Sequence, residues 1–546
     1  MRVTMLRFVR IVLVVGTVGT VALTAQQPPP PLVTAQEILD GLTPDGSRWL
    51  TFGGNYSNHR HSPLTEITPA NVHQLTPQWT FQTATIGNFE TTTLLRDNIL
   101  YVTGPQNVAW ALDARTGRQI WRYRRELPTV GLTACCGLVN RGFGVLGDKL
   151  FMTTLDAHLL ALDMKTGSIV WDATLEDYKI GYASTIAPLV VKDKVIVGVA
   201  GGEFGIRGFI DAYEAQTGKR AWRTFTIPGP GEPGNDTWAG DSWKTGGAGV
   251  WVTGAYDPEQ NLVFFGTGNP GPDYHSESRK GDNLYSASVI ALDGDTGRLR
   301  WHYQFTPHDV HDWDSTEVPI LADITVAGQM RKVLMFANRN GFYYTLDRTN
   351  GKVIAAKPFV TTTWAKEIGR DGRPIMLPGH TPDENGELTC PDITGGTNFW
   401  PPAFDPATST FFVNAREVCA TFYAWKPEFT PGERFTGGAA QRAQGPDSPV
   451  YGALRAIDPA TAERKWEFRY ISPSTAGLLT TASGLIFSGD GEGNLLALDS
   501  RSGKLLWHYQ MGATMHGTSP ITYMLDGRQH VLVPAGTTLT AWALPR

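Results

Sequence analysis

The sequence has little charge, few cysteines and no long heptad pattern. Charged residues make up 18% of the 546 positions and the formal net charge is −5, so no basic surface for nucleic acid is indicated. The four cysteines include no CxxCH motif, so they encode no c-type haem attachment. Cys390 and Cys419 are available for an ordinary structural bridge, and a few specific cysteines are typical of an exported protein.

Glycine, proline and tryptophan are the abundant residue types. The chain has 60 glycines, 36 prolines and 17 tryptophans. This composition favours many short strands joined by tight turns, with a large aromatic side chain recurring as an anchor. The length suits two or three ordinary domains or one large repeat architecture. We therefore predict an all-β protein.

The first residues carry the pattern of a targeting segment. Arg2, Arg7 and Arg10 precede an apolar run over residues 11–23 and the small residue Ala25. We predict a signal peptide over 1–25, a Pro-rich linker over 26–44, a folded part over 45–546 and export to the periplasm. The apolar run is short for a transmembrane span, and an uncleaved anchor is the alternative.

One pattern recurs along the chain: an apolar residue, Ala or Tyr, Leu, Asp, two residues, Thr-Gly, three residues and Trp. Its seven copies, some of them partial, centre on Asp113, Asp163, Glu214, Asp293, Asp347, Asp458 and Asp499. Each copy predicts a β-hairpin whose Asp accepts turn amides and whose Gly adopts a positive φ. Four-stranded blades recur about every 45 residues, and Trp121, Trp171 and Trp222 follow one another at about that interval.

The repeat predicts an eight-bladed β-propeller in which each Trp docks one blade on the next. We expect the eighth blade to join both ends of the chain, pairing a strand over 539–544 with an early strand near Trp49 or Trp79. The long insertions between Trp222 and Trp301, and between Asp347 and Trp466, should lie on one face and build the functional site.

An acidic stretch follows the strand predicted over residues 288–292. Asp309, Asp312 and Asp314 fall within six residues of one another, beside His308 and His311. Acidic side chains just past a strand lie where catalytic groups are commonly carried on a rigid scaffold. A solvated acidic loop is the alternative.

Three features resemble one family. The hairpin-Trp repeat, the run Cys-Cys-Gly-Leu-Val-Asn-Arg-Gly over 135–142 and the run Gly-Thr-Gly-Asn-Pro over 266–270 resemble the quinoprotein alcohol dehydrogenases, which depend on pyrroloquinoline quinone (PQQ) and are related to methanol dehydrogenase. The resemblance covers residues 45–546. It implies PQQ with Ca²⁺ or a lanthanide ion, oxidation of an alcohol or sugar hydroxyl by hydride transfer, and electrons passed to a separate acceptor such as cytochrome c or a quinone-linked carrier. A homodimer is left open.

The resemblance also assigns contacts to the cofactor. Cα atoms of neighbours lie about 3.8 Å apart, so a Cys135–Cys136 disulfide is a strained ring; in the family such a ring packs on one face of PQQ, and two free thiols are the alternative. Trp251 matches the residue on the other face, with a core Trp as the alternative. Further matches to contacts of the PQQ carboxylates are Arg141, Thr185, Glu90 and Asn398; ordinary turn chemistry is the alternative for Thr185 and Asn398.

The resemblance implies a metal site made of Glu203, Asn269 and Asp312. Their oxygen atoms are hard ligands. Pairing of Glu203 with Arg207 is the alternative from the residues alone. Asp314 is an extra aspartate at the place where lanthanide-dependent members have one, and Ca²⁺ and a lanthanide both stay open.

Two catalytic roles follow from the same resemblance. Asp312 matches the catalytic base, and Arg339 matches the basic residue that hydrogen-bonds the quinone oxygens. His311 and Thr475 depart from the pattern of methanol dehydrogenase and leave larger or more polar alcohols open as substrates. The rival hypothesis is a non-catalytic propeller scaffold of the outer-membrane assembly type, which has no use for these residues.

Overall fold

The computed structural model describes residues 32–87, 89–443 and 450–546, so the predicted signal peptide lies outside the described residues. Residues Val33–Arg546 form one compact unit. Within the described ranges nearly all regular structure is β, with one α-helix and several single-turn 3₁₀ helices. No helix in these ranges is long and apolar enough to span a membrane. The all-β prediction is confirmed.

The folded unit begins earlier than predicted. Helix α1 (Ala35–Asp40) lies inside the proposed linker and carries a capping box between Thr34 and Glu37. Val33 and Ile38 are buried, and Arg96 forms an ion pair of 2.6 Å with Glu37. The boundary at residue 45 was therefore wrong, because the segment from Val33 onward packs on the sheets.

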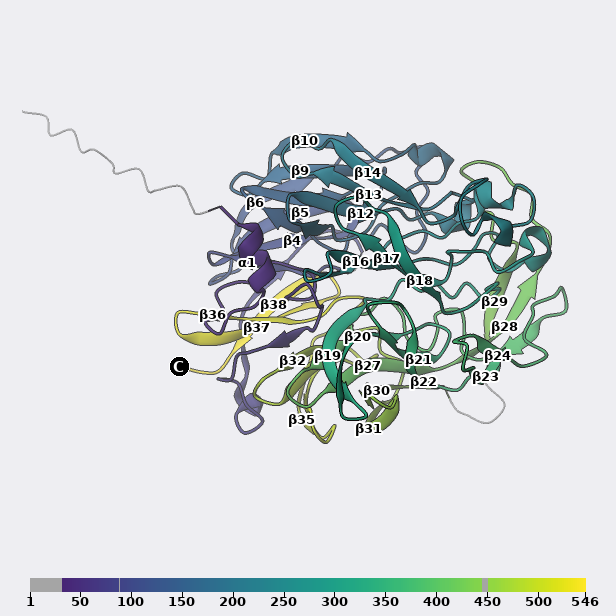
Figure 1. Cartoon of the computed structure of the whole chain (residues 1–546). Helices are drawn as coiled ribbons and strands as arrows, with labels where there is room; N and C mark the ends of the chain where they lie inside the picture. Colours follow the sequence, from purple (N-terminus) through teal and green to yellow (C-terminus); the bar gives the residue numbers. More distant parts are fainter. Residues whose placement is uncertain (1–31, 88, 444–449) are drawn as a thin grey trace, which may run out of the picture. The chain divides into compact units, whose positions relative to one another are not determined.

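Eight sheets of four or five strands form the body of this unit (Figure 1). In six of them the strands come from one continuous segment of the chain or from one segment with an insertion, and in a seventh an early strand is added to such a segment. These sheets contain β3 (Leu94–Arg96), β4 (Ile99–Thr103), β5 (Val108–Asp113) and β6 (Gln119–Arg124); β7 (Gly144–Leu146), β8 (Lys149–Thr153), β9 (His158–Asp163) and β10 (Ile169–Thr174); β11 (Leu189–Val191), β12 (Lys194–Gly198), β13 (Phe209–Glu214) and β14 (Arg220–Phe225); β15 (Ala255–Asp257), β16 (Leu262–Gly266), β17 (Ser288–Asp293) and β18 (Leu299–Gln304); β19 (Ile320–Val326), β20 (Gln329–Ala337), β21 (Phe342–Asp347) and β22 (Val353–Pro358); β26 (Ala403–Asp405), β27 (Thr410–Glu417), β30 (Tyr451–Asp458) and β31 (Glu463–Tyr470); and β32 (Leu479–Thr481), β33 (Leu485–Gly489), β34 (Asn494–Asp499) and β35 (Leu505–Gln510), with β1 (His61–Ser62) added in parallel to β32.

The remaining large sheet joins distant parts of the sequence. It contains β2 (Thr76–Gln82), β36 (Ile521–Leu525), β37 (Arg528–Ala535) and β38 (Thr538–Ala543). Trp79 of β2 lies opposite Ala541 of β38. The prediction that an early strand near Trp79 pairs with the last strand is confirmed, whereas Trp49 forms an isolated bridge with Leu95.

The hairpin turns have the geometry that the repeat predicts. Asp113 Oδ1 accepts hydrogen bonds from the backbone amides of Arg115 and Thr116, and Gly117 has a φ of +69°. The indole of Trp79 donates to the carbonyl of Ala114 at 3.1 Å and covers Gly117 so closely that a Cβ there would lie 2.4 Å from the ring. The same bond to the next repeat is made from Trp121 to Met164, from Trp171 to Ala215 and from Trp301 to Arg348.

Arg60 ties together segments that are far apart in the sequence. It is fully buried, and its guanidinium donates to the carbonyls of Phe52, Leu478 and Pro520 and to the hydroxyl of Thr92. A buried cation needs such a complete set of acceptors. Arg60 therefore links the beginning of the folded unit to its last two sheets through hydrogen bonds.

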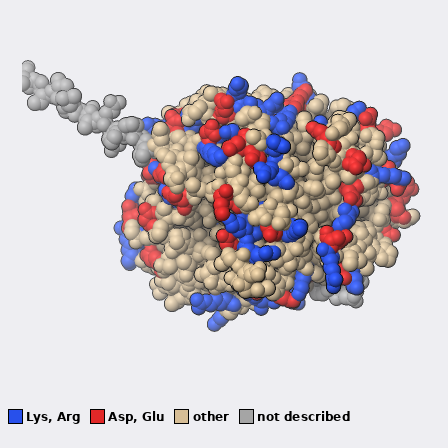
Figure 2. All heavy atoms as spheres, in the orientation of Figure 1, with Lys and Arg blue, Asp and Glu red and all other residues tan. Residues whose placement is uncertain are grey.

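Two insertions, one between β22 and β26 and one between β27 and β30, add two small sheets, which lie together at one edge of the view in Figure 1: β23 (Ala365–Ile368) with β24 (Pro374–Met376), and β25 (Glu387–Thr389) with β28 (Cys419–Ala424) and β29 (Gly438–Ala443). A disulfide between Cys390 and Cys419 confirms the predicted bridge. The main-chain amide of Phe435, in the insertion between β27 and β30, donates to the carbonyl of Glu203 at 2.7 Å, so this insertion reaches the predicted site. On the face drawn in Figure 2, acidic and basic side chains are interspersed.

Candidate active site

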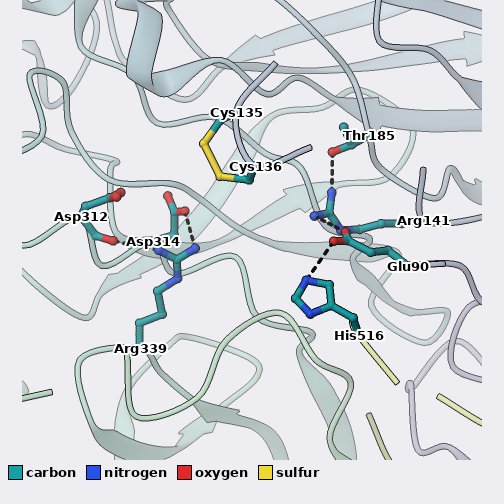
Figure 3. The surroundings of a disulfide bond; sticks show 9 residues. All are labelled: Glu90, Cys135, Cys136, Arg141, Thr185, Asp312, Asp314, Arg339 and His516. Atoms are coloured by element: carbon teal, nitrogen blue, oxygen red, sulfur yellow. Dashed lines mark hydrogen bonds and ion pairs between the residues drawn. A yellow bond between two sulfur atoms is a disulfide. The ribbon is translucent and has the colours of Figure 1, made fainter. Parts of the chain in front are cut away.

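Cys135 and Cys136 form a disulfide between neighbouring residues, as predicted, with Cα atoms 3.8 Å apart. No cysteine within the described ranges is free. Ligand atoms of Cys135, Cys136 and Glu203 lie within 4.8 Å of one another, which places the disulfide beside the predicted metal-ligand residue. Figure 3 shows the disulfide facing a space bounded by two groups of side chains, Asp312, Asp314 and Arg339 on one side and Glu90, Arg141, Thr185 and His516 on the other.

Arg141 forms the cationic centre of the second group. It pairs with Glu90 at 2.8 Å and donates to the hydroxyl of Thr185 at 2.5 Å (Figure 3). Its guanidinium lies over the rings of Trp251 and Phe399, 4.7 and 4.5 Å from their centroids. Burial lowers the pKa of Arg141, although the charge of Glu90 opposes that shift. This corner holds a desolvated cation whose Nε has no hydrogen-bond partner.

Arg339 is the cation of the first group. Its guanidinium pairs with Asp314 at 3.0 Å, donates to the main-chain oxygen of Asp312 at 2.9 Å and lies 5.7 Å from the ring centroid of Trp251. Burial lowers the pKa of Arg339, but the charges of Asp314, Asp312 and Glu317 together raise it by more, so the net shift is upward. Trp251 therefore connects the two guanidinium groups, and the Nε of Arg339 is also without a partner.

The predicted metal-ligand residues come from three separate loops. Glu203 lies in the 3₁₀ helix Gly202–Phe204, Asn269 follows β16, and Asp312 and Asp314 follow β18. The main-chain amide of Asn269 donates a hydrogen bond to Asp314 Oδ1 at 2.8 Å, and this bond joins two of these loops. Because Arg207 pairs with Glu232, the alternative pairing of Glu203 with Arg207 is wrong.

Like charges dominate this part of the site. Burial raises the pKa of Glu203, and the charge of Asp314 raises it further. The pKa of Asp312 is well above its usual range because of burial and then because of the charges of Asp273 and Asp314. Asp312 has a φ of 60°, a left-handed conformation that Asp and Asn tolerate better than most residues.

The residues present fit both groups that the sequence implies. Carboxylate and amide oxygens that repel one another in a buried site are suited to a hard cation such as Ca²⁺ or a lanthanide. Two buried guanidinium groups with unpartnered Nε atoms, joined by one aromatic ring, are suited to a planar, polyanionic quinone.

Other predicted residues are used differently. Asn398 donates to the carbonyl of Thr394 and accepts from the amide of Phe399, which is the turn chemistry of the alternative interpretation. His311 is buried and stacks on Trp313 with 4.1 Å between the ring centroids, so it does not line an open pocket.

Sequence reasoning missed three buried charged residues next to the site: Asp273, Arg279 and Glu317. Asp273 stands three residues after the Gly-Thr-Gly-Asn-Pro run, and that proximity was the signal that its sequence offered. Glu317 stands three residues after Asp314 but belongs to no pattern; Arg279 belongs to no pattern either, and the fold brings it to Asp309.

The comparisons with known proteins agree with this geometry. The family model "PQQ: Glucose/ethanol/alcohol dehydrogenase, beta-propeller domain" matches residues 49–357 and 447–531. The chain is 39% identical to quinohemoprotein alcohol dehydrogenase ADH IIB of Pseudomonas putida over 90% of this chain and 74% of the relative. It is 35% identical to methanol dehydrogenase [cytochrome c] subunit 1 of Paracoccus denitrificans over 92% of this chain and 85% of the relative.

A solved structure of a europium-containing methanol dehydrogenase superposes with a TM-score of 0.87 at 33% identity, over 93% of this chain and all of the other. The fold and the site therefore define a quinoprotein with a β-propeller domain. The chain belongs to the family of PQQ-dependent alcohol dehydrogenases, whose cofactors are PQQ with Ca²⁺ or a lanthanide ion.

Proposed function

We propose that this protein is a periplasmic PQQ-dependent dehydrogenase that oxidises the hydroxyl of an alcohol, polyol or sugar and passes the electrons to a separate acceptor such as cytochrome c. The eight large sheets act as eight blades locked by the indole contacts, and residues 1–25 are a cleaved signal peptide. The observation that carries this proposal is the pair of buried guanidinium groups on Trp251, set beside the vicinal disulfide and the acidic loops.

In this proposal each group has one task. Arg141 and Thr185 hold carboxylates of PQQ, and Glu90 supports Arg141 through their ion pair. The disulfide and Trp251 cover the two faces of the ring system, which matches their flat surfaces to a planar ligand. The cation is held by Glu203, Asn269, Asp312 and Asp314, whose oxygens are of the type that hard cations bind.

When bound, PQQ supplies a two-electron acceptor for the hydride of the substrate carbinol carbon. Asp312 removes the proton of the substrate hydroxyl. Asp312 is only partly buried, and a nearby cation favours the ionised form that a base requires. Arg339 is already held by Asp314 and by the main chain of Asp312, so it presents fixed donors to negative charge that develops beside it.

The scaffold hypothesis does not account for these charges. Glu90 pairs with Arg141 and Asp314 with Arg339, but taking these four charged groups out of water costs free energy that ion pairing repays only in part. A scaffold of the same repeat gains nothing from them, whereas a cofactor with several carboxylates and a cation compensates them.

Reconstitution tests the proposal. The metal-free protein is given PQQ with either Ca²⁺ or La³⁺, and dye reduction is followed with alcohols and sugars. We expect turnover with at least one ion and substrate class. The variant Arg141→Gln should bind PQQ at least about tenfold more weakly, whereas Arg115→Gln, which removes an exposed ion pair with Asp526, should leave PQQ binding unchanged. Absence of PQQ binding under both ions would replace this proposal with the scaffold hypothesis.

A further inference from the structure

His516 contacts the part of the site that holds Arg141, and no proposed role uses it. It lies in the segment between β35 and β36, and its side chain is 38% exposed. The ring places Nδ1 3.2 Å from the hydroxyl of Thr475 and Nε2 3.5 Å from Oε1 of Glu90 (Figure 3). Glu90 is also the residue that pairs with Arg141. His516 therefore shares a carboxylate with the cation that is proposed to bind PQQ.

The fold holds the turn that carries His516 against the segment that carries Glu90. The hydroxyl of Thr518 donates to the main-chain oxygen of Thr91 at 2.6 Å, which joins the two segments beside the ion pair. Gly517 has a φ of +63°, and a Cβ at this position would lie 3.3 Å from Cγ of Glu90. Both backbones are therefore fixed where the side chains of His516 and Glu90 meet.

The partners of the His516 ring favour its doubly protonated form. The single proton of the Thr475 hydroxyl is directed at the main-chain oxygen of Met515, 3.1 Å away, so Nδ1 of His516 is the donor to Thr475. Nε2 faces a carboxylate oxygen, which only accepts hydrogen bonds, so this nitrogen needs a proton as well. An imidazolium ring satisfies both contacts, whereas either neutral tautomer leaves one ring nitrogen facing a lone pair.

The ion pair between Glu90 and Arg141 is incompletely hydrogen-bonded. Oε2 of Glu90 lies 2.8 Å from the guanidinium, but in a direction that makes no hydrogen bond, and this oxygen has no other partner. The Nε of Arg141 is also without a partner. A carboxylate of a ligand must compete with Glu90 for Arg141, and a second cation at Oε1 of Glu90 weakens that competition.

Glu90 is the one charged side chain among the described residues that forms an ion pair with His516, and Arg141 lies behind it. Asp490 and Glu492 belong to a neighbouring segment, but Asp490 accepts from main-chain amides of its own turn and Glu492 accepts from a serine hydroxyl. With an imidazolium ring, the three contacting groups carry one negative and two positive charges. With a neutral ring their charges cancel, and no net charge remains there to attract a carboxylate.

We propose that His516 is a positioning residue of the PQQ site, which holds Glu90 by the oxygen that Arg141 does not use and so leaves Arg141 available to a carboxylate of the cofactor. Because this role concerns PQQ, it rests on the proposed function. PQQ binding should then depend on the charge of His516, and histidine is the side chain whose charge changes between about pH 5 and 8. The effect should also pass through Glu90 and disappear when Glu90 is replaced.

Equilibrium binding of PQQ tests this role without any need for turnover. PQQ is titrated into the protein at about pH 5.5 and about pH 8, with Ca²⁺ or La³⁺ present, and binding is followed by quenching of tryptophan fluorescence. His516→Gln should weaken binding about fivefold at the lower pH and less than about twofold at the higher pH. The control His158→Gln removes a histidine that pairs with Asp172 at 2.6 Å, and it should change the affinity less than about twofold at both pH values.

A double substitution separates an effect through Glu90 from direct contact between His516 and the ligand. In a Glu90→Gln background the competing carboxylate is gone, so His516→Gln should change the affinity for PQQ less than about twofold. A full fivefold loss in that background, or an affinity of the single variant His516→Gln that equals the wild-type value at both pH values, would overturn this role while leaving the proposed function intact. Absence of PQQ binding by the wild type under both ions would overturn the proposed function and this role with it.

Discussion

Replacement of Asp312 by asparagine tests the proposed base with little disturbance of the neighbouring residues. Asn is close to Asp in volume and tolerates the φ of 60° at this position. Arg339 contacts the main-chain oxygen of residue 312, which the substitution retains. The change therefore removes a carboxylate and leaves the neighbouring cation in place.

The expected loss follows from the role of a general base. Proton removal by a positioned side chain contributes about 10²–10⁴-fold, which corresponds to about 3–5 kcal/mol of activation free energy. We expect kcat of Asp312→Asn to fall by that factor when it is expressed per site loaded with PQQ and metal. In the loaded wild type the bound cation favours the ionised form of Asp312, so the rate should rise with pH through the acidic range as this group ionises, and the variant should lose that dependence.

Dye reduction over a range of pH, with PQQ and metal content measured on the same sample, provides the assay. Asp309→Asn is the matched control on the same loop, because Asp309 accepts hydrogen bonds from the amides of His311 and Trp313 and has a structural task. It should lose stability and keep its rate per loaded site within about tenfold. If Asp312→Asn keeps turnover within the same range, Asp312 is not the base.

Three further predictions concern stability. Burial raises the pKa of Glu317 to about 8 from 4.5, so the folded state holds a proton that the unfolded chain releases, and the free energy of unfolding should fall as pH rises between these values by up to about 1.4 kcal/mol per unit. Glu317→Gln should flatten that slope in urea titrations of the metal-free protein at pH 5 and 8, and an unchanged slope would assign it to other carboxyl groups. Arg60→Met removes the hydrogen bonds to three buried carbonyls and should lower the free energy of unfolding in urea by about 3–5 kcal/mol. A loss below about 1 kcal/mol would show that these hydrogen bonds do not stabilise the fold. Gly117→Ala should lower the melting temperature more than Gly147→Ala, since both glycines have positive φ but only Gly117 meets the Trp79 ring, and equal losses would show that the indole contact is unimportant.

The elements that the sequence predicted well are local ones. The Asp and Gly of each repeat lie within five residues of one another, and their turn follows from hydrogen bonds and a positive φ that those residues alone determine. The choice between Trp49 and Trp79 as the partner of the last strand was not decidable, because both are aromatic residues in early strand-like runs and pairing depends on distant segments. The capping box at Thr34 was present in the sequence and outweighs the Pro-rich run before it.

Site residues that belong to a sequence motif were predicted. Residues that only the fold brings together were missed. The cysteine pair is adjacent in the sequence, so its disulfide requires no tertiary information beyond the resemblance. Asp273 belongs to no periodic pattern and no motif, and the burial of its carboxylate without a hydrogen-bond partner depends on tertiary structure. The pairing of Arg339 with Asp314 likewise depends on side-chain directions that a sequence does not contain.

The sheet that joins β2 to β38 has a consequence for how the chain folds. Its contacts connect residues up to 467 positions apart, for example Thr76 and Ala543. Each doubling of a closed loop costs about 0.6 kcal/mol, so this closure costs about 3 kcal/mol more than a hairpin spanning about 15 residues. Ring closure should therefore be a late and slow event in folding. A newly synthesised chain exposes β2 as an unpaired edge until β38 arrives, and such an edge is prone to aggregation during that interval.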